Sequence, residues 1–471
     1  MRRAKIVCTL GPASSDADRL LEMINAGMDI ARFNMSHGSY PEHEERLRNL
    51  RDAEAKADRP IGLLADLQGP KIRLGTFGGD GSAVLDDGQE FTVTTLDVVG
   101  DKNHVGCTHK GLPHDVKPGD QILVDDGKIL MVAKRVTETD VVCEVIVGGP
   151  VSNHKGFNLP GASVSVPAMS EKDADDLRWA LRNGFDMVAL SFVRDAADVD
   201  LVRQVMTEEG RTVPVIAKLE KPQAIENLDD IIDAFDAFMV ARGDLGVELP
   251  LEEVPLVQKQ IITKARRWAK PVIVATQMLE SMIGNPRPTR AEASDVANAI
   301  LDGADAVMLS GETSVGKYPV ETVGTMAKIV DSTEVHGMEQ ISSIDWDPHT
   351  TGGVISKSAV DVAERVGAAY LVAFTQSGDT ARRMARLRPR IPIVAFSPLV
   401  KTQRELTLSW GIRTVLTPTV EATDDMVRLV DRTLKEKGVV QDGERVVIVA
   451  GTPAGRPGRT NSLRVHKIGS V

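Results

Sequence analysis

The sequence predicts an α/β protein, in which a (β/α)8 TIM barrel carries an inserted β-rich lid domain and a C-terminal α/β regulatory domain. Eight short apolar runs alternate with polar segments that can form helices. This alternation breaks once, after Leu67, and a second alternating series follows the last barrel run. We therefore expect the barrel in residues 1–70 and 167–335, the lid domain in 71–166, and the C-terminal domain in 336–471.

The eight apolar runs each have the length and composition of a buried parallel strand. They are residues 5–10, 29–34, 61–67, 187–192, 214–219, 237–241, 271–276 and 306–311. The segments between them have helical character. Strands of such a barrel present their functional side chains at their carboxyl ends, so these ends are where we look for a site.

The two remaining domains are predicted from different patterns. In 71–166, turn signals (GGDG, DDG, KPGD, VDDG) separate alternating strands such as FTVTT, ILMVAKRV and VVCEVIV. A domain inserted there lies over the barrel mouth and can close on it. In 336–471, the strands YLVAFT, IPIVAF, TVLTP and RVVIVAG alternate with helices.

The composition excludes several classes of function. A net charge of −11 over 471 residues argues against binding to nucleic acid or to an anionic membrane. Cys8, Cys107 and Cys143 have no paired spacing, which predicts neither a disulfide framework nor a zinc site. The chain has no apolar stretch of membrane-spanning length. These observations predict a cytoplasmic protein.

The strand 214–219 ends in Lys218, and Glu220 lies two residues further, so both side chains point the same way. Alone, they suit a surface ion pair. Other strand ends also carry polar or charged side chains that a core would reject. These residues are Arg32, Asn34, Ser36, Asp66, Arg242, Asp244, Thr276, Ser310 and Glu312. Their number favours a site at the barrel mouth over a coincidence of surface charges.

The residue types at the mouth predict phosphoryl transfer. Glu220 and Asp244 can hold one Mg²⁺ ion and leave places for substrate oxygens. Arg32, Lys218 and Arg73 supply fixed positive charge, which neutralises a moving phosphoryl group. The strand ends show no Ser–His or Cys–His nucleophile pattern. The run GETSVGK resembles a P-loop, but the next residue is tyrosine where serine or threonine should bind Mg²⁺.

A series of longer motifs in one order identifies a resemblance to the pyruvate kinase family. The motifs are KIVCTLGPAS, ARFNMSHG, ADLQGPKIR, KGFNLPG, PAMSEKD, AKLEKPQAIENLDDI, MVARGDLGVELP, ATQMLESM, PTRAEASDVANAI and MLSGETSVGKYPVE. The resemblance covers nearly the whole chain. It implies transfer of the phosphoryl group of phosphoenolpyruvate to ADP in glycolysis, giving pyruvate and ATP. It also implies Mg²⁺ or Mn²⁺ as cofactor and a homotetramer.

The resemblance assigns roles to the residues at the mouth. Lys218 matches the lysine that stabilises the phosphoryl group in flight, and Arg32 matches the arginine that grips the phosphate. Glu220 and Asp244 match the carboxylates that bind the divalent ion. Thr276 matches the threonine that lines the pocket where enolpyruvate is protonated.

Further roles follow from the same resemblance. The backbone of 241–243, including Gly243, surrounds the substrate carboxylate. Arg73 faces ATP, and His37 and Asn34 lie near the nucleotide and the cation. Taken as a lone residue, a histidine such as His37 is more often structural.

The monovalent-cation site implied by the resemblance shows a departure. Asn34, Ser36, Asp66 and Leu67 correspond to the K⁺ site, but Lys71 stands where K⁺-dependent members carry a glutamate. Leu67, Gln68 and Leu74 differ together with it. Because a lysine ammonium is a fixed monovalent cation, we expect Lys71 to replace K⁺ and activity to be independent of added K⁺. The alternative is a surface lysine at the lid hinge.

The C-terminal domain resembles the regulatory domain of the family. Its turn with Thr375, Ser377, Gly378 and Thr380 suits a phosphate, although Ser377 or Asp379 in an ordinary helix N-cap would look the same. Arg456 and Arg459 follow in a late loop, and Arg382, Arg383 and Arg386 on the next helix add charge. We expect a phosphorylated effector. The carboxylate of Asp379 favours a nucleoside or sugar monophosphate over fructose 1,6-bisphosphate.

Two alternatives remain at this point. A Mg²⁺-dependent barrel lyase that makes a pyruvate enolate shares the metal carboxylates and an arginine, but does not explain the lid or the C-terminal domain. In a non-catalytic metabolite sensor, we would expect some of the functional residues at the barrel mouth to be replaced. In this sequence they are all present. Pyruvate release that depends on ADP distinguishes the transferase from the lyase.

Overall fold

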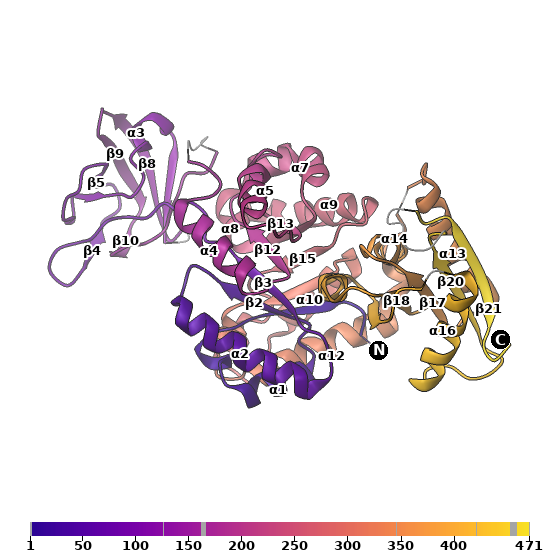
Figure 1. Cartoon of the computed structure of the whole chain (residues 1–471). Coiled ribbons are helices and arrows are strands. Elements are labelled where there is room, and N and C mark those ends of the chain that lie inside the picture. Colours follow the sequence, from indigo (N-terminus) through magenta and orange to yellow (C-terminus); the bar gives the residue numbers. More distant parts are fainter. Residues whose placement is uncertain are drawn as a thin grey trace.

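The computed structural model describes residues 2–125, 127–161, 166–344, 346–420, 422–452 and 459–470. Three bodies lie in a row: the lid at one end, the barrel in the middle and the C-terminal domain at the other end (Figure 1). No helix in the described part of the chain is long and apolar enough to cross a membrane. The exact domain boundaries stay predictions.

The predicted barrel is confirmed. Eight parallel strands close on themselves, with β1 hydrogen-bonded to both β2 and β16. The strands are β1 (Lys5–Thr9), β2 (Ile30–Asn34), β3 (Gly62–Asp66), β12 (Met187–Leu190), β13 (Val215–Leu219), β14 (Ala237–Ala241), β15 (Val272–Ala275) and β16 (Ala306–Leu309). Each coincides with one of the apolar runs, because a strand covered on both faces excludes polar residues.

Helices surround the barrel. The longer ones are α1 (Ala17–Ala26), α2 (Tyr40–Ala57), α4 (Glu171–Arg182), α5 (Asp198–Glu208), α7 (Leu228–Ala234), α9 (Val254–Arg267), α10 (Arg290–Asp302) and α12 (Pro319–Gly337). Shorter turns are η1 (Pro12–Ser14), α6 (Pro222–Glu226), α8 (Arg242–Glu248), η2 (Leu251–Glu253), η3 (Glu280–Ile283), α11 (Gly311–Ser314) and η4 (Met338–Gln340). The sequence sets the ends of α10: a capping box of Thr289 and Glu292 starts it, and Gly303 with φ of 98° ends it.

The barrel core is aliphatic, in keeping with an aromatic content of 4%. Val7, Ile216 and Met239 belong to a cluster inside the barrel. A larger cluster lies between the strands and the helices. The filled interior leaves only the ends of the barrel for a site.

The lid contains a six-stranded sheet in the order β11-β7-β8-β9-β5-β6 and a separate two-stranded pair, β10-β4. Its elements are β4 (Ser82–Leu85), β5 (Glu90–Thr94), β6 (His104–Gly106), α3 (Leu112–Asp115), β7 (Gln121–Val124), β8 (Ile129–Val136), β9 (Asp140–Val147), β10 (Gly149–Ser152) and β11 (Phe157–Asn158). The lid has its own hydrophobic core, which includes Phe91, Ile122 and Met131. Its internal packing therefore does not depend on the barrel.

The C-terminal domain is a five-stranded sheet in the order β19-β18-β17-β20-β21, and only β21 is antiparallel to its neighbour. Its elements are α13 (Thr351–Val366), β17 (Tyr370–Phe374), α14 (Asp379–Ala385), β18 (Ile393–Ser397), α15 (Val400–Glu405), η5 (Leu406–Leu408), β19 (Ile412–Leu416), α16 (Thr423–Glu436), β20 (Arg445–Ala450) and β21 (Ser462–Lys467). Buried polar contacts join it to the barrel: Arg388 pairs with Asp305 at 3.1 Å, and Trp410 Nε1 donates to Glu334 Oε1 at 3.1 Å.

Candidate active site

The strand-end residues gather at the carboxyl end of the barrel. Arg32 lies in β2, Asp66 ends β3, Lys218 lies near the end of β13, and Glu220 and Thr276 follow β13 and β15. Because all eight strands are parallel, these side chains reach one mouth.

Lys218 is the central cation of this mouth. Its Nζ lies 2.9 Å from Glu220 Oε1 and 3.4 Å from Asp66 Oδ1, and it donates a hydrogen bond to Ser191 Oγ at 2.7 Å. The side chain is 13% exposed. Burial lowers the pKa of Lys218, but the carboxylates of Asp66, Glu220 and Asp244 outweigh burial and raise the pKa above its ordinary value. The ammonium therefore stays charged at any physiological pH.

Asp66 links Lys218 to Arg32. Arg32 Nε donates to Asp66 Oδ2 at 2.6 Å, and Arg32 Nη1 donates to Thr9 Oγ1 at 2.7 Å. Burial raises the pKa of Asp66, but the charges of Lys218 and Arg32 more than offset this and hold the pKa below its usual range. One ionised carboxylate thus orients two cations toward the mouth.

Glu220 has the properties of a metal ligand. Its Oε2 accepts a hydrogen bond from the Phe192 N–H at 2.9 Å, whereas its buried Oε1 lies 2.9 Å from the Lys218 ammonium. Burial, followed by the charge of Asp244, raises the pKa of Glu220 although Lys218 opposes this. A fully buried carboxylate that feels the charge of a second carboxylate, Asp244, suits a shared cation. Within the described residues, no group of three or more His, Cys, Asp or Glu is arranged for a metal. Two carboxylates would leave places on Mg²⁺ for substrate oxygens.

The loop after β15 is strained and tightly held. Thr276 has a φ of 71° and Gln277 a φ of 55°, a region that non-glycine residues rarely adopt. Thr276 Oγ1 accepts from the Gly243 N–H at 2.8 Å, and Arg242 Nη2 donates to the Thr276 carbonyl at 2.9 Å. Arg242 also pairs with Asp295 at 2.7 Å. The guanidinium of Arg242 therefore fixes the Thr276 loop.

The expected nucleotide residues are spread over two domains. Arg73 lies in the lid, where its N–H donates to Thr108 Oγ1 at 2.9 Å and its Nη1 to the His154 carbonyl at 3.2 Å. His37 is exposed and Asn34 is half-buried on the barrel. No contact among the described residues joins Arg73 to either of them.

The oxygens expected to hold K⁺ are partly engaged. Asn34 Oδ1 accepts from the Ser36 N–H at 3.1 Å, and the Leu67 carbonyl accepts from Ser191 Oγ at 2.8 Å. Asp66 is committed to Arg32 and Lys218.

Lys71 lies beside the lid backbone. A methyl group placed on Gly156 would lie 2.9 Å from Lys71 Cε and 3.6 Å from Lys71 Nζ. The structure gives the Lys71 ammonium no ion pair with a described residue. Its role as a substitute for K⁺ stays a prediction.

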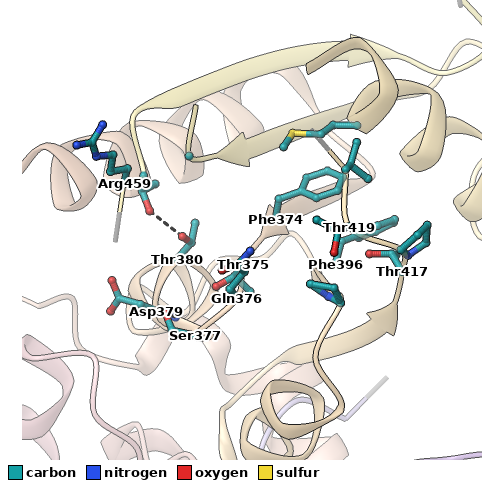
Figure 2. A pocket seen from close by; sticks show the side chains of 16 residues that line it. Phe374, Thr375, Gln376, Ser377, Asp379, Thr380, Phe396, Thr417, Thr419 and Arg459 are labelled. Atoms are coloured by element: carbon teal, nitrogen blue, oxygen red, sulfur yellow. Dashed lines mark hydrogen bonds between the residues drawn. The ribbon is translucent and has the colours of Figure 1, made fainter. Parts of the chain in front are cut away.

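A pocket lies at the expected effector site of the C-terminal domain (Figure 2). Thr375, Ser377, Thr380 and Arg459 line it, together with the aromatic rings of Phe374 and Phe396. The Gly378 N–H donates to Thr375 Oγ1 at 2.9 Å, and the hydroxyls of Thr380 and Thr460 share a hydrogen bond of 2.7 Å. Arg456 lies outside the described residues.

The arginines of α14 differ from expectation, because none of them lines this pocket. Arg383 forms an ion pair of 2.6 Å with Asp379 on the same helix. Arg382 and Arg386 instead line pockets shared with the barrel. A helix of seven residues turns its side chains to several directions, and the sequence alone does not say which of them faces the effector turn.

Two functional residues were missed by sequence reasoning. Ser191 and Thr9 are buried and bind the two cations of the mouth, Lys218 and Arg32 respectively. Neither carries a charge that a core would reject. The only available signal was position, since Ser191 follows β12 and Thr9 ends β1.

Comparisons with known proteins agree with this geometry. Residues 1–323 match the model of the pyruvate kinase barrel domain, and residues 354–466 match that of the pyruvate kinase alpha/beta domain. The chain is 58% identical to a pyruvate kinase of Corynebacterium glutamicum, over 99% of this chain and 98% of the relative. It is 55% identical to a pyruvate kinase of Mycobacterium tuberculosis, over 99% of both chains.

A solved structure extends the likeness to the fold. The crystal structure of a pyruvate kinase from Cryptosporidium parvum superposes with a TM-score of 0.92 at 33% identity, covering 99% of this chain and 96% of the other. Family models and relatives thus account for nearly the whole chain. The chain belongs to the pyruvate kinase family, and its reaction is phosphoryl transfer from phosphoenolpyruvate to ADP.

Proposed function

We propose that this transfer takes place between Lys218, Arg32 and the carboxylates of Glu220 and Asp244. The observation that supports this most is the position of the Lys218 ammonium, which two carboxylates hold at the mouth in its charged form. A fixed cation that needs no reorganisation stabilises charge as it develops. Arg32, oriented by Asp66, binds the phosphate of phosphoenolpyruvate from the neighbouring strand.

The divalent cation of the family belongs at Glu220 and Asp244. Their fit rests on two carboxylates that influence each other's charge, of which Glu220 is fully buried, and Mg²⁺ or Mn²⁺ would supply charge neutralisation there. The chain's own contribution is rigidity, because the Phe192 N–H holds the second oxygen of Glu220 in place. A ligand fixed in this way can bind without rearrangement.

Thr276 and Gly243 position the rest of phosphoenolpyruvate. Their mutual hydrogen bond places the Thr276 hydroxyl beside the start of α8, where the backbone of 241–243 would surround the substrate carboxylate. The Thr276 hydroxyl lines the pocket in which enolpyruvate takes up its proton. We assign it a place in the pocket and leave the source of the proton open.

The nucleotide would bind between barrel and lid. Arg73 reaches from the lid, and His37 and Asn34 lie on the barrel side. This arrangement uses lid closure to bring ADP to the phosphoryl group and to exclude water.

Several further properties belong to the same proposal. Lys71 replaces K⁺, so that K⁺ is dispensable. A phosphorylated metabolite binds the pocket of Thr375, Ser377, Thr380 and Arg459. The chain forms a homotetramer in the cytoplasm. Titration of nucleoside and sugar monophosphates against the cooperativity for phosphoenolpyruvate tests the effector assignment; fructose 1,6-bisphosphate as the strongest activator would contradict it.

The substitution Lys218→Met tests the central assignment. Turnover is measured as ADP-dependent pyruvate release with phosphoenolpyruvate and Mg²⁺. We expect a loss of at least about 10³-fold, because a preorganised charge is removed from the transition state. Circular dichroism should show a retained fold, and Lys56→Met, at an exposed lysine near the end of α2, serves as a lysine control. Retained turnover in Lys218→Met would remove the assignment, and ADP-independent pyruvate release would favour a lyase.

A further inference from the structure

Two arginines, Arg382 in α14 and Arg386 directly after it, line space between the C-terminal domain and the barrel, and Arg382 also donates to the Ser377 carbonyl at 2.9 Å. Figure 1 shows α14 on the side of the C-terminal sheet that faces the barrel. Arg382 and Arg386 line a pocket there, and neither lines the pocket of Figure 2. The function proposed so far leaves these buried charges without a purpose.

The space in front of them is a cleft between the two domains. Its barrel wall consists of the starts of β12 and β14 and the segments before β13 and β15, which is the face opposite the catalytic mouth. Its other wall includes Arg382, Lys401 and Leu408 of the C-terminal domain. The cleft encloses about 300 Å³, at the lower end of the range for small-molecule sites.

The inner end of the cleft narrows into a pocket of about 10 Å³, which has room for one oxygen atom of a ligand held in the cleft, and Lys270, Arg382 and Ser409 line both spaces. Charge in this inner pocket is unbalanced. Five cationic side chains meet there, and among its lining residues only Asp305 is acidic. Those cations are Arg266, Lys270, Arg382, Arg386 and Arg388. Asp305 already pairs with Arg388 at 3.1 Å.

Several buried donors of the inner pocket lack a partner. Arg386 is 5% exposed, and its Nη1 donates to the Arg267 carbonyl at 2.8 Å. Its Nε and Nη2 bind none of the described residues, and neither does the hydroxyl of Ser409, which is 1% exposed. The Nε atoms of Arg266 and Arg388 are in the same situation. Donors buried without an acceptor cost free energy that a bound anion would recover.

The arginine side chains of the inner pocket carry positive charge that their neighbours do not fully balance. Burial lowers the pKa of Arg266 to about 9, helped by the charge of Arg388, and lowers the pKa of Arg386 to about 10, helped by Arg383. The guanidinium of Arg386 stacks on Trp346, with Cζ 3.5 Å from the ring centroid, which fixes its orientation. The arginines of the inner pocket are therefore held in place, and too few carboxylates lie near them to balance their positive charge.

We propose that this interdomain cleft is a second anion site, which binds the phosphate group of a small phosphate monoester between Ser409, Arg382 and Arg386. A tetrahedral dianion accepts several hydrogen bonds at once, which matches guanidinium and hydroxyl donors. The outer cleft is of mixed charge, since Arg203 pairs with Asp236 and Glu405 lies 3.7 Å from Lys401. These carboxylates suit the hydroxyl groups of the same ligand.

The position of the site gives it a regulatory consequence. A ligand there contacts the barrel and the C-terminal domain together, so its binding favours one placement of the C-terminal domain on the barrel. It acts from the face opposite Lys218 and needs neither the effector pocket nor catalysis. Binding of an anion in the cleft does not depend on the roles proposed for the residues at the mouth.

Crystals of the full chain soaked in tungstate, a tetrahedral dianion with strong anomalous scattering, test the site directly. We expect an anomalous peak within hydrogen-bond distance of Ser409 Oγ and Arg386. A peak at the catalytic mouth without one in the cleft would overturn the proposal. A peak in the cleft that does not weaken in crystals of Ser409→Ala would mark an adventitious ion only, and would overturn it too.

Thermal unfolding with inorganic phosphate, against chloride at matched ionic strength, tests the site in solution. Phosphate that binds the mouth or the effector pocket contributes equally to wild type and to Ser409→Ala, so the difference reports the cleft. We expect the phosphate concentration for half-maximal stabilisation to rise about tenfold in Arg382→Gln and Ser409→Ala. Arg365→Gln, which removes an exposed arginine paired with Asp361, should leave it unchanged. Equal phosphate responses in wild type and both cleft variants would contradict the proposal.

Discussion

At the level of single residues, Asp66 decides how charge is arranged at the mouth. It accepts from Arg32 at 2.6 Å and lies 3.4 Å from Lys218, so one buried carboxylate balances part of two positive charges. Glu220 lies 2.9 Å from the same Lys218, so the two cations of the mouth meet two buried carboxylates. Buried ion pairs contribute little to stability because desolvation offsets the attraction. The cluster is therefore better explained by substrate binding than by folding.

Ser191 should act as a positioning residue for Lys218. Its hydroxyl bridges the Lys218 ammonium and the Leu67 carbonyl. In Ser191→Ala the Lys218 ammonium loses one of its three polar partners, and its position becomes less fixed. We expect kcat to fall about tenfold with less than a threefold change in the KM for phosphoenolpyruvate. The reason is that the position of the Lys218 ammonium matters more in the transition state than in the substrate complex.

Ser356→Ala is the matched control for that experiment. Ser356 is also fully buried, but it lies in α13 of the C-terminal domain. It should leave kcat unchanged. A Ser191→Ala enzyme with wild-type kcat, or one that loses only its thermal stability, would show that the serine has a structural role alone.

Lys71 predicts how the enzyme responds to monovalent cations. We expect full turnover in buffers that contain only Na⁺ or Tris, because the fixed ammonium supplies the charge. Lys71→Glu should make turnover depend on K⁺ and rise more than about tenfold when K⁺ is added. Lys71→Met, which removes the charge without adding a carboxylate, is the comparison. Near-zero wild-type turnover without K⁺ would contradict the prediction.

The residues that sequence reasoning found share one property. Arg32, Lys218 and Glu220 are charged residues at the ends of apolar strands, and burial makes that combination improbable without a function. Ser191 and Thr9 were missed because short hydroxyl side chains are common in cores. The positive φ angles of Phe192 and Thr276 arise from the packing of loops, which no local pattern specifies.

At the level of elements, the sequence predicted which residues lie at the ends of the barrel strands. It did not predict which way the side chains of short helices point. Successive side chains of a strand point to opposite faces, so the face on which a barrel residue lies follows from its position along the strand. The short helix α14 has side chains in all directions, and its contacts with β18 and with the barrel decide which arginine meets which pocket. The sequence therefore predicted a turn before α14, whose effector role stays a prediction, but not the direction of Arg382 and Arg386.

The junction of β3, β12 and α15 carries a titratable group. Asp186 precedes β12, accepts from the Leu63 N–H at 2.8 Å, and lies 3.9 Å from Arg404 of α15. Burial raises the pKa of Asp186 to about 6, although the hydrogen bond and the arginines oppose this. The folded state thus binds the proton more tightly than the unfolded state. Stability from this group is complete below about pH 4 and is lost as the pH rises through 6.

Asp186→Asn should therefore stabilise the protein at alkaline pH. Asparagine is neutral and still accepts from Leu63, so the cost of a buried charge disappears. We expect a gain of about 1–3 kcal/mol near pH 8, seen as a higher Tm in calorimetry, that shrinks as the pH falls below about 6. Asp361→Asn, at an exposed ion pair, should show no such pH dependence. A lower Tm of Asp186→Asn at pH 8 would mean that the ion pairs of Asp186 with Arg404 at 3.9 Å and Arg51 at 4.0 Å stabilise the fold by more than the burial of its charge costs.

At the level of the whole molecule, the three bodies divide the work. The barrel holds the cluster proposed for phosphoryl transfer, the lid holds Arg73, which we propose binds the nucleotide, and the C-terminal domain carries the pocket of Figure 2. In the described part of the chain, the barrel lies between the lid and the C-terminal domain (Figure 1). Any signal from the C-terminal domain to the mouth must therefore pass through barrel contacts such as Arg388–Asp305 or through neighbouring chains.

Assembly is the last property that we predict. In the described C-terminal sheet, β21 is an outer strand that pairs with β20 alone, and an uncovered strand edge favours pairing with a second copy. Val465 of β21 is 42% exposed, and Leu256 at the start of α9 is 68% exposed. Two separate surfaces of this kind are what a tetramer with two kinds of two-fold contact requires.

Light scattering should accordingly give a wild-type mass of four chains. Val465→Lys places like charges next to one another across a two-fold strand pair, so we expect it to leave dimers held by the barrel surface. Cooperativity for phosphoenolpyruvate should fall with the mass, because coupling between sites needs the interface. Val439→Lys, at a partly exposed position beyond α16, should remain tetrameric. A wild-type mass of one or two chains would contradict the tetramer, and a tetrameric Val465→Lys would move the contact away from β21.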